Sequence, residues 1–315
     1  MMSPLIGAVA WRVGLLLLIG AGLILLIDVR AGRRTSVAAP LAERQARARG
    51  SLWQRFRVWV VGIVVLFAGA ASGPVGFALL LALLSMQAVR EVAAALRARR
   101  IAVPVWLVAI AAPLIVLSGL VVHGRVMVVG AVAPVLCGPI VVSLARRGAA
   151  SRPSVVVATM AALGYVAAPL SVLAATLERP DGLALVCWLL IVIVLSDTCA
   201  MFGGLAFGRR PIATRISPGK TLEGLIAGLV GAVAGATVMR FAFPASSLAV
   251  SAVAALGVGV AGIVGDLLAS ALKRAADVKD FSRFLPGHGG LMDRLDSVLI
   301  GVPALALLIW LGLLR

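Results

Sequence analysis

Residues 248–296 read LAVSAVAALGVGVAGIVGDLLASALKRAADVKDFSRFLPGHGGLMDRLD, an apolar run followed directly by a charge-dense stretch. The first part, residues 248–272, is long enough to cross the hydrocarbon core of a bilayer as one helix. The second part, residues 270–296, holds five basic residues, four of the chain's twelve acids and one of its two histidines. The junction indicates a membrane helix that ends in a polar site at the membrane surface.

The rest of the chain has the composition of a membrane protein, with 62% hydrophobic and 13% charged residues. Its long runs of apolar residues exceed what the core of a soluble protein of this size needs. We therefore predict an all-α, polytopic integral membrane protein with about ten transmembrane helices. The predicted spans are residues 11–29, 58–71, 75–88, 102–122, 126–145, 155–177, 183–207, 222–243, 248–272 and 298–314.

The basic residues predict the orientation, because loops rich in Lys and Arg stay in the cytoplasm. Five alternate loops carry 24 of the 29 Lys and Arg residues. These loops are residues 30–57, 90–100, 146–152, 209–220 and 273–294. We expect them to face the cytoplasm from the cell (inner) membrane, with both termini outside. They account for the net charge of +17, so nucleic acid is not an expected partner.

The chain changes character near residue 190. Residues 1–190 form about six predicted helices for packing and lipid contact, and Glu91 beside Arg90 is interpreted as an interfacial ion pair. Residues 191–315 form the predicted catalytic region, because Asp197 and Asp266 fall inside predicted spans. An ionisable side chain there costs about 2.5–3.5 kcal/mol and indicates a functional cavity.

Small residues in the eighth span indicate close helix packing. Gly224 and Gly228, and then Gly231 and Gly235, form two pairs spaced by four residues. This spacing lets two helices approach closely in lipid. We predict that these glycines serve packing and not ligand binding.

The charged stretch predicts a binding site for a metal and phosphates. If the ninth helix continues past the membrane, one of its faces carries Asp266, Ser270, Lys273, Arg274 and Asp277. Asp293 and Asp296 lie one turn apart in a helix that begins near Met292. Together with Asp266, these carboxylates suit Mg²⁺ or Mn²⁺, since neither Cys nor His accompanies them.

A second group of residues predicts anion binding. Ser217 followed by Pro218 is typical of a helix N-cap, which places free backbone amides beside Lys220 and Thr221. The nearby cations exceed what the local acids need. With a metal at the membrane surface, they favour phosphoryl or nucleotidyl transfer to a lipid. The basic residues could instead be ordinary cytoplasmic charges, and an ion-coupled transporter could use Asp197 and Asp266 equally well.

The signature from Ser270 to Asp296 resembles that of the phosphatidate cytidylyltransferase family. The shared elements are Ser-x-Leu-Lys-Arg, Lys-Asp, Pro-x-His-Gly-Gly and Asp-Arg-x-Asp, and further similar blocks extend the resemblance over residues 197–297. Two positions depart from the family pattern. The family often has an aromatic residue at the position of Met201 and a lysine at the position of Gly219. These departures concern substrate detail more than the type of reaction.

The resemblance implies an enzyme that joins CTP and phosphatidate into CDP-diacylglycerol and pyrophosphate. The implied catalytic residues are Asp197, Lys273, Arg274, Lys279, Asp280 and His288. The implied substrate-binding residues are Ser217, Lys220, Thr221, Ser270 and Arg294, and the metal ligands are Asp266, Asp293 and Asp296. The implied partners are CTP, phosphatidate in the bilayer and membrane lipids, and a homodimer is left open. The alternatives are a cytidylyltransferase for another lipid phosphate, such as an ether lipid, and the ion-coupled transporter.

Overall fold

The computed structural model describes residues 7–8, 10–12, 14, 60–121, 123–148, 154–243, 245–285 and 289–314. In this part the all-α prediction is confirmed, since only two isolated β-bridges occur beside the helices. The helices are Val60–Ala71, α3 (Pro74–Ala98), α4 (Val105–Ser118), α5 (His123–Arg147), α6 (Val155–Thr176), α7 (Gly182–Phe207), α8 (Leu222–Val238), the 3-10 turn η2 (Arg240–Ala242), α9 (Leu248–Ala275) and α10 (Met292–Trp310). Most of the predicted first span and the loop 30–57 lie outside the described residues.

Five of the described helices are long and apolar enough to cross a membrane, namely α3, α6, α7, α9 and the part Val129–Arg147 of α5. The helix Val60–Ala71, α4 and α8 are apolar but shorter. The protein is therefore a membrane protein with several apolar helices, and the count of ten spans stays a prediction.

Four predicted segments differ most from the observed helices, and one of them is the tenth, 298–314, which is observed as α10, Met292–Trp310. The third predicted segment ends at residue 88, but α3 continues to Ala98, so Arg90 and Arg97 lie on the helix and not in a loop. The fourth prediction, 102–122, is too long because α4 covers only Val105–Ser118. The eighth prediction, 222–243, is divided between α8 and η2. Hydropathy does not resolve the end of α3, because charged residues continue this helix beyond its apolar run.

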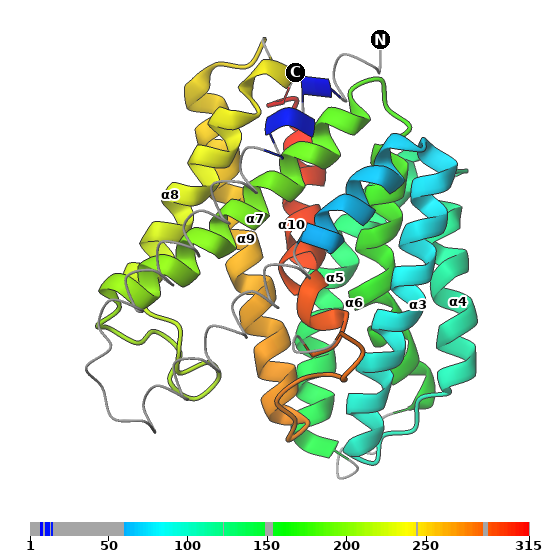
Figure 1. Ribbon diagram of the computed structural model, residues 1–315. Coiled ribbons are helices and arrows are strands. Elements are labelled where there is room, and N and C mark those ends of the chain that lie inside the picture. The colour runs from blue at the N-terminus through cyan, green and yellow to red at the C-terminus, as the bar shows by residue number, and fades with distance from the viewer. Residues whose placement is uncertain are drawn as a thin grey trace.

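The helices form two groups with α10 between them (Figure 1). Helices α7, α8 and α9 pack together on one side, and α3, α4, α5 and α6 form the other group. Helix α10 contacts α9 and α7 in the first group and α5, α6 and α3 in the second. The group α3 to α6 thus comes from the N-terminal part of the chain and the group α7 to α9 from the C-terminal part, and α10 lies against both.

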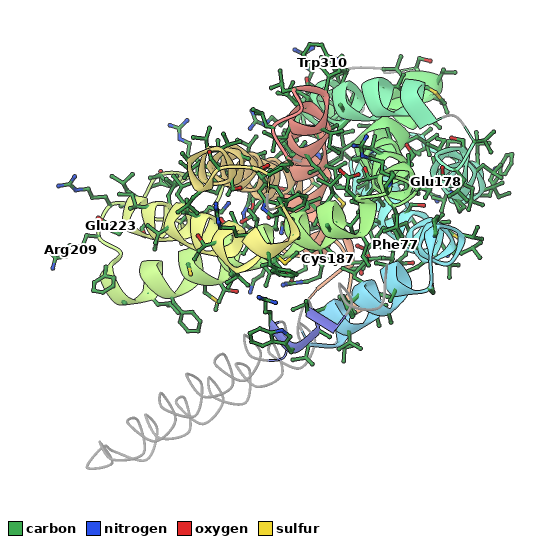
Figure 2. All side chains as sticks on the ribbon, turned by 90° about the horizontal axis from the view of Figure 1, so that it is seen from above. Phe77, Glu178, Cys187, Arg209, Glu223 and Trp310 are labelled. Atoms are coloured by element: carbon green, nitrogen blue, oxygen red, sulfur yellow. The ribbon has the colours of Figure 1, made fainter. Side chains whose placement is uncertain are left out.

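The interior of this bundle is apolar, as Figure 2 shows from above: Phe77 and Cys187 lie inside, whereas Arg209 and Glu223 lie at one edge. Helix α6 is buried on nearly every side, and the fully buried Trp188 of α7 is among the largest core side chains. Such burial leaves the charged side chains few places inside the bundle. Three aspartates nevertheless lie within helices, Asp197 in α7, Asp266 in α9 and Asp296 in α10.

The glycines of α8 let this helix pack closely along α7, as predicted. A Cβ atom on Gly231 would lie 2.7 Å from the Cβ atom of Cys199, and one on Gly235 would lie 3.0 Å from the Cα atom of Val192. Gly224 is similarly close to the carbonyl oxygen of Ala200, at 2.8 Å. Real Cβ atoms do not approach so near, so these glycines set the distance between the helices.

We expect Gly231→Ala to destabilise the fold, because its new methyl group would overpack the contact with α7. Overpacking of this kind typically costs about 1–3 kcal/mol. Gly257→Ala is the matched control, because a Cβ atom at this position meets nothing within 4 Å. The alanine there also removes the entropic cost of a glycine inside a helix. Thermal unfolding of the purified protein should show a lower midpoint for Gly231→Ala alone. Equal midpoints would contradict the packing role.

Four of the basic loops meet at one end of the bundle. The Arg99 guanidinium, after α3, bonds to Asp277 at 2.6 Å and donates to the carbonyl oxygen of Ala145 in α5 at 3.1 Å. Arg274 of α9 donates to the carbonyl oxygen of Ile216, between α7 and α8, at 3.3 Å. The C-terminus lies at the opposite end, where Ser246 donates to the carbonyl oxygen of Leu313 (Figure 1).

Helix α9 ends at Ala275, two residues before Asp277. Asp277 has φ 57°, and the next amide, of Val278, donates to the carbonyl oxygen of Lys273 at 2.9 Å. This left-handed residue with a bond back across the last turn is a Schellman helix end. The prediction that Asp277 continues the face of Asp266 and Ser270 is therefore wrong.

Candidate active site

Three helices bring carboxylates together inside the bundle. Asp197 of α7, Asp266 of α9 and Asp296 of α10 lie near one another. Helices α9 and α10 touch here because Gly265 has no side chain to separate its backbone from the carbonyl group of Asp296. The structure thus brings Asp197 and Asp266, which we predicted from their place in membrane spans, close to Asp296, which we predicted from the signature.

Asp266 forms the more open of two lysine–aspartate pairs. Its Oδ2 atom lies 2.7 Å from Nζ of Lys220, in the loop before α8, and its Oδ1 atom accepts a hydrogen bond from Ser270 at 3.3 Å. The Lys220 and Asp266 side chains are 21% and 36% exposed. An incoming anion can therefore reach this ammonium group from solvent.

Asp293 forms the second and more buried pair. Its Oδ1 atom lies 2.6 Å from Nζ of Lys273, and the two side chains are only 5% and 15% exposed. Its Oδ2 atom accepts hydrogen bonds from the backbone amides of Phe281 at 3.1 Å and Gly290 at 2.9 Å. Asp293 therefore joins the end of α9, the loop that follows it and the start of α10, which begins at Met292 as predicted.

The predicted metal ligands do not form a ready ligand cluster. Among the described residues, no group of three or more His, Cys, Asp and Glu side chains is arranged to hold a metal ion. Asp266 is paired with Lys220, and both oxygens of Asp293 are hydrogen-bonded as described above. The protein alone does not supply a closed metal site in this arrangement, and the assignment of Asp266, Asp293 and Asp296 as ligands stays a prediction.

The helix cap before α8 differs from the prediction. The N-cap is Thr221, whose hydroxyl accepts a hydrogen bond from the amide of Gly224 at 3.2 Å. Ser217 instead lies in a turn, where its carbonyl oxygen accepts from the amide of Lys220 at 3.2 Å. The prediction of a cap at Ser217 is wrong because the chain from Ser217 to Lys220 turns before the helix begins.

The remaining predicted residues lie around the two pairs. Lys279, Asp280 and Arg274 are exposed, and Arg294 is half-buried in the first turn of α10. Asp280 faces Gly289, where a Cβ atom would lie 3.0 Å from that of Asp280 and where φ is 79°. His288 lies outside the described residues.

Sequence reasoning missed Glu91 of α3, which is only 3% exposed and makes four hydrogen bonds. Three of its donors belong to the signature region, from Ser282 to Met292. The interpretation as an interfacial ion pair with Arg90 is wrong, because the Glu91 carboxylate is buried whereas Arg90 is exposed on a different side of the helix. One signal was present: Glu91 shares a helical face with Ala88 and Ala95, which are both buried.

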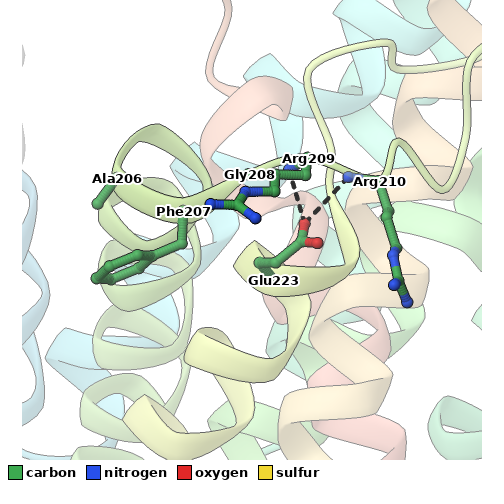
Figure 3. Close-up of a pocket in the computed structure, with 6 residues that line it drawn as sticks. All are labelled: Ala206, Phe207, Gly208, Arg209, Arg210 and Glu223. Atoms are coloured by element: carbon green, nitrogen blue, oxygen red, sulfur yellow. Dashed lines mark hydrogen bonds between the residues drawn. The ribbon is translucent and has the colours of Figure 1, made fainter.

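A separate open pocket of about 400 Å³ lies at the end of α7 (Figure 3). Glu223 closes one of its sides by accepting hydrogen bonds from the backbone amides of Arg209 at 2.9 Å and Arg210 at 3.2 Å. None of its lining residues is a predicted site residue. We therefore place the candidate active site at the lysine–aspartate pairs, where the charged groups converge, and not in this pocket.

Comparison with known proteins shows the family of this chain. The sequence model of the cytidylyltransferase family matches residues 53–311. The chain belongs to the cytidylyltransferase family. This membership covers α3 to α10, so helices of both groups belong to the family fold.

Several curated relatives carry the name phosphatidate cytidylyltransferase. The protein of Helicobacter pylori (strain J99) is 39% identical over 129 residues, which are 41% of this chain and 48% of the relative. The Haemophilus influenzae protein is 39% identical over 134 residues, or 39% and 44% of the two chains. The Bacillus subtilis protein is 40% identical over 130 residues, or 41% and 48%. The matched part of the chain thus spans about half the length of these relatives.

Proposed function

We propose that this cytidylyltransferase transfers the cytidylyl group of CTP to phosphatidate, which yields CDP-diacylglycerol and pyrophosphate. The observation that carries the proposal is the pair of lysine–aspartate contacts, Lys220–Asp266 and Lys273–Asp293, at the loop end of a membrane helix bundle. Two ammonium groups there provide charge for phosphates, and the surrounding apolar helices give access to a lipid. The names of the relatives support CTP and phosphatidate as the substrates.

The chemistry needs little from the protein beyond positioning and charge. A phosphate oxygen of phosphatidate attacks the α-phosphorus of CTP, and the bond to the β-phosphate breaks, so pyrophosphate leaves with the electron pair. The attacking phosphate carries its own negative charge, so no side chain has to act as a nucleophile. The accessible Lys220 would bind a substrate phosphate, and Lys273 would offset the charge that develops during transfer.

We propose Mg²⁺ or Mn²⁺ as the cofactor, with Asp266 as the carboxylate best placed to contact it. Mg²⁺ is commonly bound by one or two carboxylates together with substrate phosphates, and not by a complete cage of protein ligands. This explains why the described residues can lack a ready cluster and still serve a metal that enters with CTP. When bound, the ion would supply additional positive charge to the phosphates.

Removal of divalent cations should abolish turnover. We expect excess chelator to stop the reaction and added Mg²⁺ to restore it, since the two lysines alone do not neutralise a triphosphate. The measurement is the transfer of labelled cytidylyl group to lipid with and without chelator. A matched control adds chelator already saturated with Mg²⁺. Full turnover in free chelator would refute the metal proposal.

We further propose that the site faces the cytoplasm from the cell (inner) membrane, and that about ten helices span the bilayer. The shared end of four basic loops supports this orientation. In a variant without the three native cysteines, Gly219→Cys should react with an impermeant maleimide only in inverted vesicles. Pro180→Cys, at the opposite end of α7, should react only in intact cells. The reverse pattern would refute the orientation.

Membrane lipids are proposed partners because large apolar side chains are exposed on the outside of the bundle, such as Trp106, Val129 and Leu205. We further propose that the protein can form a homodimer. Measurement of the molecular mass of the protein in lipid nanodiscs would test this proposal. A mass of one chain at working concentrations would exclude it.

The substrate assignment is tested with purified protein, labelled CTP and a panel of lipid phosphates. We expect diacyl phosphatidate to be converted fastest. A faster reaction with an ether-linked lipid phosphate would favour the related cytidylyltransferase activity. No transfer to any lipid phosphate, with cation uptake into vesicles that requires Asp197 and Asp266, would show a transporter instead.

A further inference from the structure

The start of α10 lacks a cap from its own segment. Its N-cap residue, Leu291, makes no side-chain capping bond, and the first amides of any helix have no partner within the helix. Glu91 of α3, which lies 201 residues before Met292, takes this role. Its Oε1 atom accepts from the amide of Leu291 at 3.1 Å, and its Oε2 atom accepts from the amide of Met292 at 2.8 Å.

The same carboxylate holds the loop that precedes α10. Oε1 of Glu91 also accepts a hydrogen bond from the hydroxyl of Ser282 at 2.8 Å, while Gln87, one turn earlier in α3, donates to it at 3.0 Å. Glu91 therefore fixes two points of the chain that are nine residues apart, Ser282 and Leu291. A negative charge at a helix N-terminus is further stabilised by the helix dipole.

These contacts alternate with those of Asp293 along the loop. Asp293 binds the amides of Phe281 and Gly290, and Glu91 binds the adjacent residues Ser282 and Leu291. Any movement of the loop away from Glu91 would thus move the donors of Asp293. Because Asp293 also holds Lys273, the position of this ammonium group depends on α3.

Gly290 shows how closely the two elements fit. A Cβ atom at this position would overlap the carboxylate of Glu91, with its Cδ atom at 2.8 Å, and the three nearest atoms all belong to Glu91. A side chain at residue 290 and the carboxylate at residue 91 therefore compete for the same space.

We propose that Glu91 is a positioning residue for the reaction: its buried carboxylate caps α10, holds the loop between α9 and α10 and so fixes the Lys273–Asp293 pair. The inference rests on the proposed function, since it assigns Glu91 to that reaction without contact to substrate. It gives the N-terminal half of the chain a part in the active site. We expect Glu91 to affect turnover and not substrate binding. The proposed binding residue, Lys220, belongs to the other pair, with Asp266, and does not depend on Glu91.

The first experiment compares Glu91→Gln with Gln87→Leu in the full-length protein. Glutamine keeps the length of Glu91, but its amide nitrogen cannot accept a hydrogen bond, whereas Gln87→Leu removes only one donor. We expect Glu91→Gln to lower kcat roughly 10- to 100-fold with KM for CTP nearly unchanged, and to speed amide hydrogen exchange in residues 281–292. Gln87→Leu should change neither by more than about twofold, since a single neutral hydrogen bond contributes little. Glu91→Asp, which keeps the charge, should recover part of the turnover.

The second experiment measures the coupling between Glu91 and Gly290. Gly290→Ala should impair turnover in the native background, but Glu91→Ala with Gly290→Ala should be no worse than Glu91→Ala alone, because the space is then free. Additive losses would overturn the proposal. So would native turnover and exchange in Glu91→Gln, or a fall in its melting temperature without local exchange in the loop. Hydrogen exchange needs no turnover, so inactivity of the native protein on CTP would contradict only the proposed reaction.

Discussion

Asp293→Asn should reduce turnover by roughly 100-fold or more, which is the scale of loss when a catalytic group is misplaced by about 1 Å. The asparagine oxygen can still accept from the amides of Phe281 and Gly290, but its amide nitrogen would face the Lys273 ammonium group. This lysine would then be buried without its counter-charge, and the loop would shift to relieve the contact. Steady-state kinetics with varied CTP should show the loss mainly in kcat.

A second substitution separates the structural from the chemical part of this effect. Breaking a buried ion pair by removing one partner typically costs about 3–5 kcal/mol, whereas removal of both charges is often neutral. Lys273→Met in the Asp293→Asn background should therefore restore the melting temperature but not the activity. Recovery of both would show that the pair serves stability alone.

Lys220→Ala is expected to weaken substrate binding, with KM for CTP or phosphatidate raised roughly tenfold or more. Hydrogen bonds to charged groups contribute about 1.5–3 kcal/mol, and Lys220 would contact a phosphate that is already charged before the reaction. The partial exposure of Lys220 and Asp266 supports this difference from the buried pair. The folded protein should keep its stability, because this pair lies near solvent.

Two controls accompany Lys220→Ala. Lys220→Arg keeps the charge and should retain most of the affinity, and Arg215→Ala removes an exposed cation from the same loop and should have little effect. If Lys220→Ala lowered kcat without a change in either KM, or if Arg215→Ala had the same effect, the assignment of Lys220 to substrate binding would be wrong.

Much of the fold follows from local pattern. The observed α6, α7 and α9 begin within one residue of the predicted spans, because long apolar runs bounded by polar turns have few other solutions in a bilayer. The pairing of Asp266 with Ser270 follows from their helical spacing, and the glycines of α8 pack as their spacing indicates. These features depend on residues within one or two helical turns.

The features that were missed depend on residues far apart in the chain. Glu91 and Met292 are 201 positions apart, and nothing in either segment specifies that they meet. The cap at Thr221 was missed because Ser217 followed by Pro218 has the local pattern of an N-cap, but the bridge between Pro211 and Thr221 moves the helix start downstream. Tertiary contacts thus determine which of several local patterns is used.

The transfer of the nucleotidyl group itself is the central claim, and the position of a radiolabel in CTP tests it most directly. Purified protein with phosphatidate vesicles should move label from the α-phosphorus of CTP into the lipid fraction, with release of one pyrophosphate for each lipid modified. Label at the γ-phosphorus should appear only in pyrophosphate. Lipid that carries the γ-label, or vesicles that stay unlabelled with either nucleotide, would contradict the account.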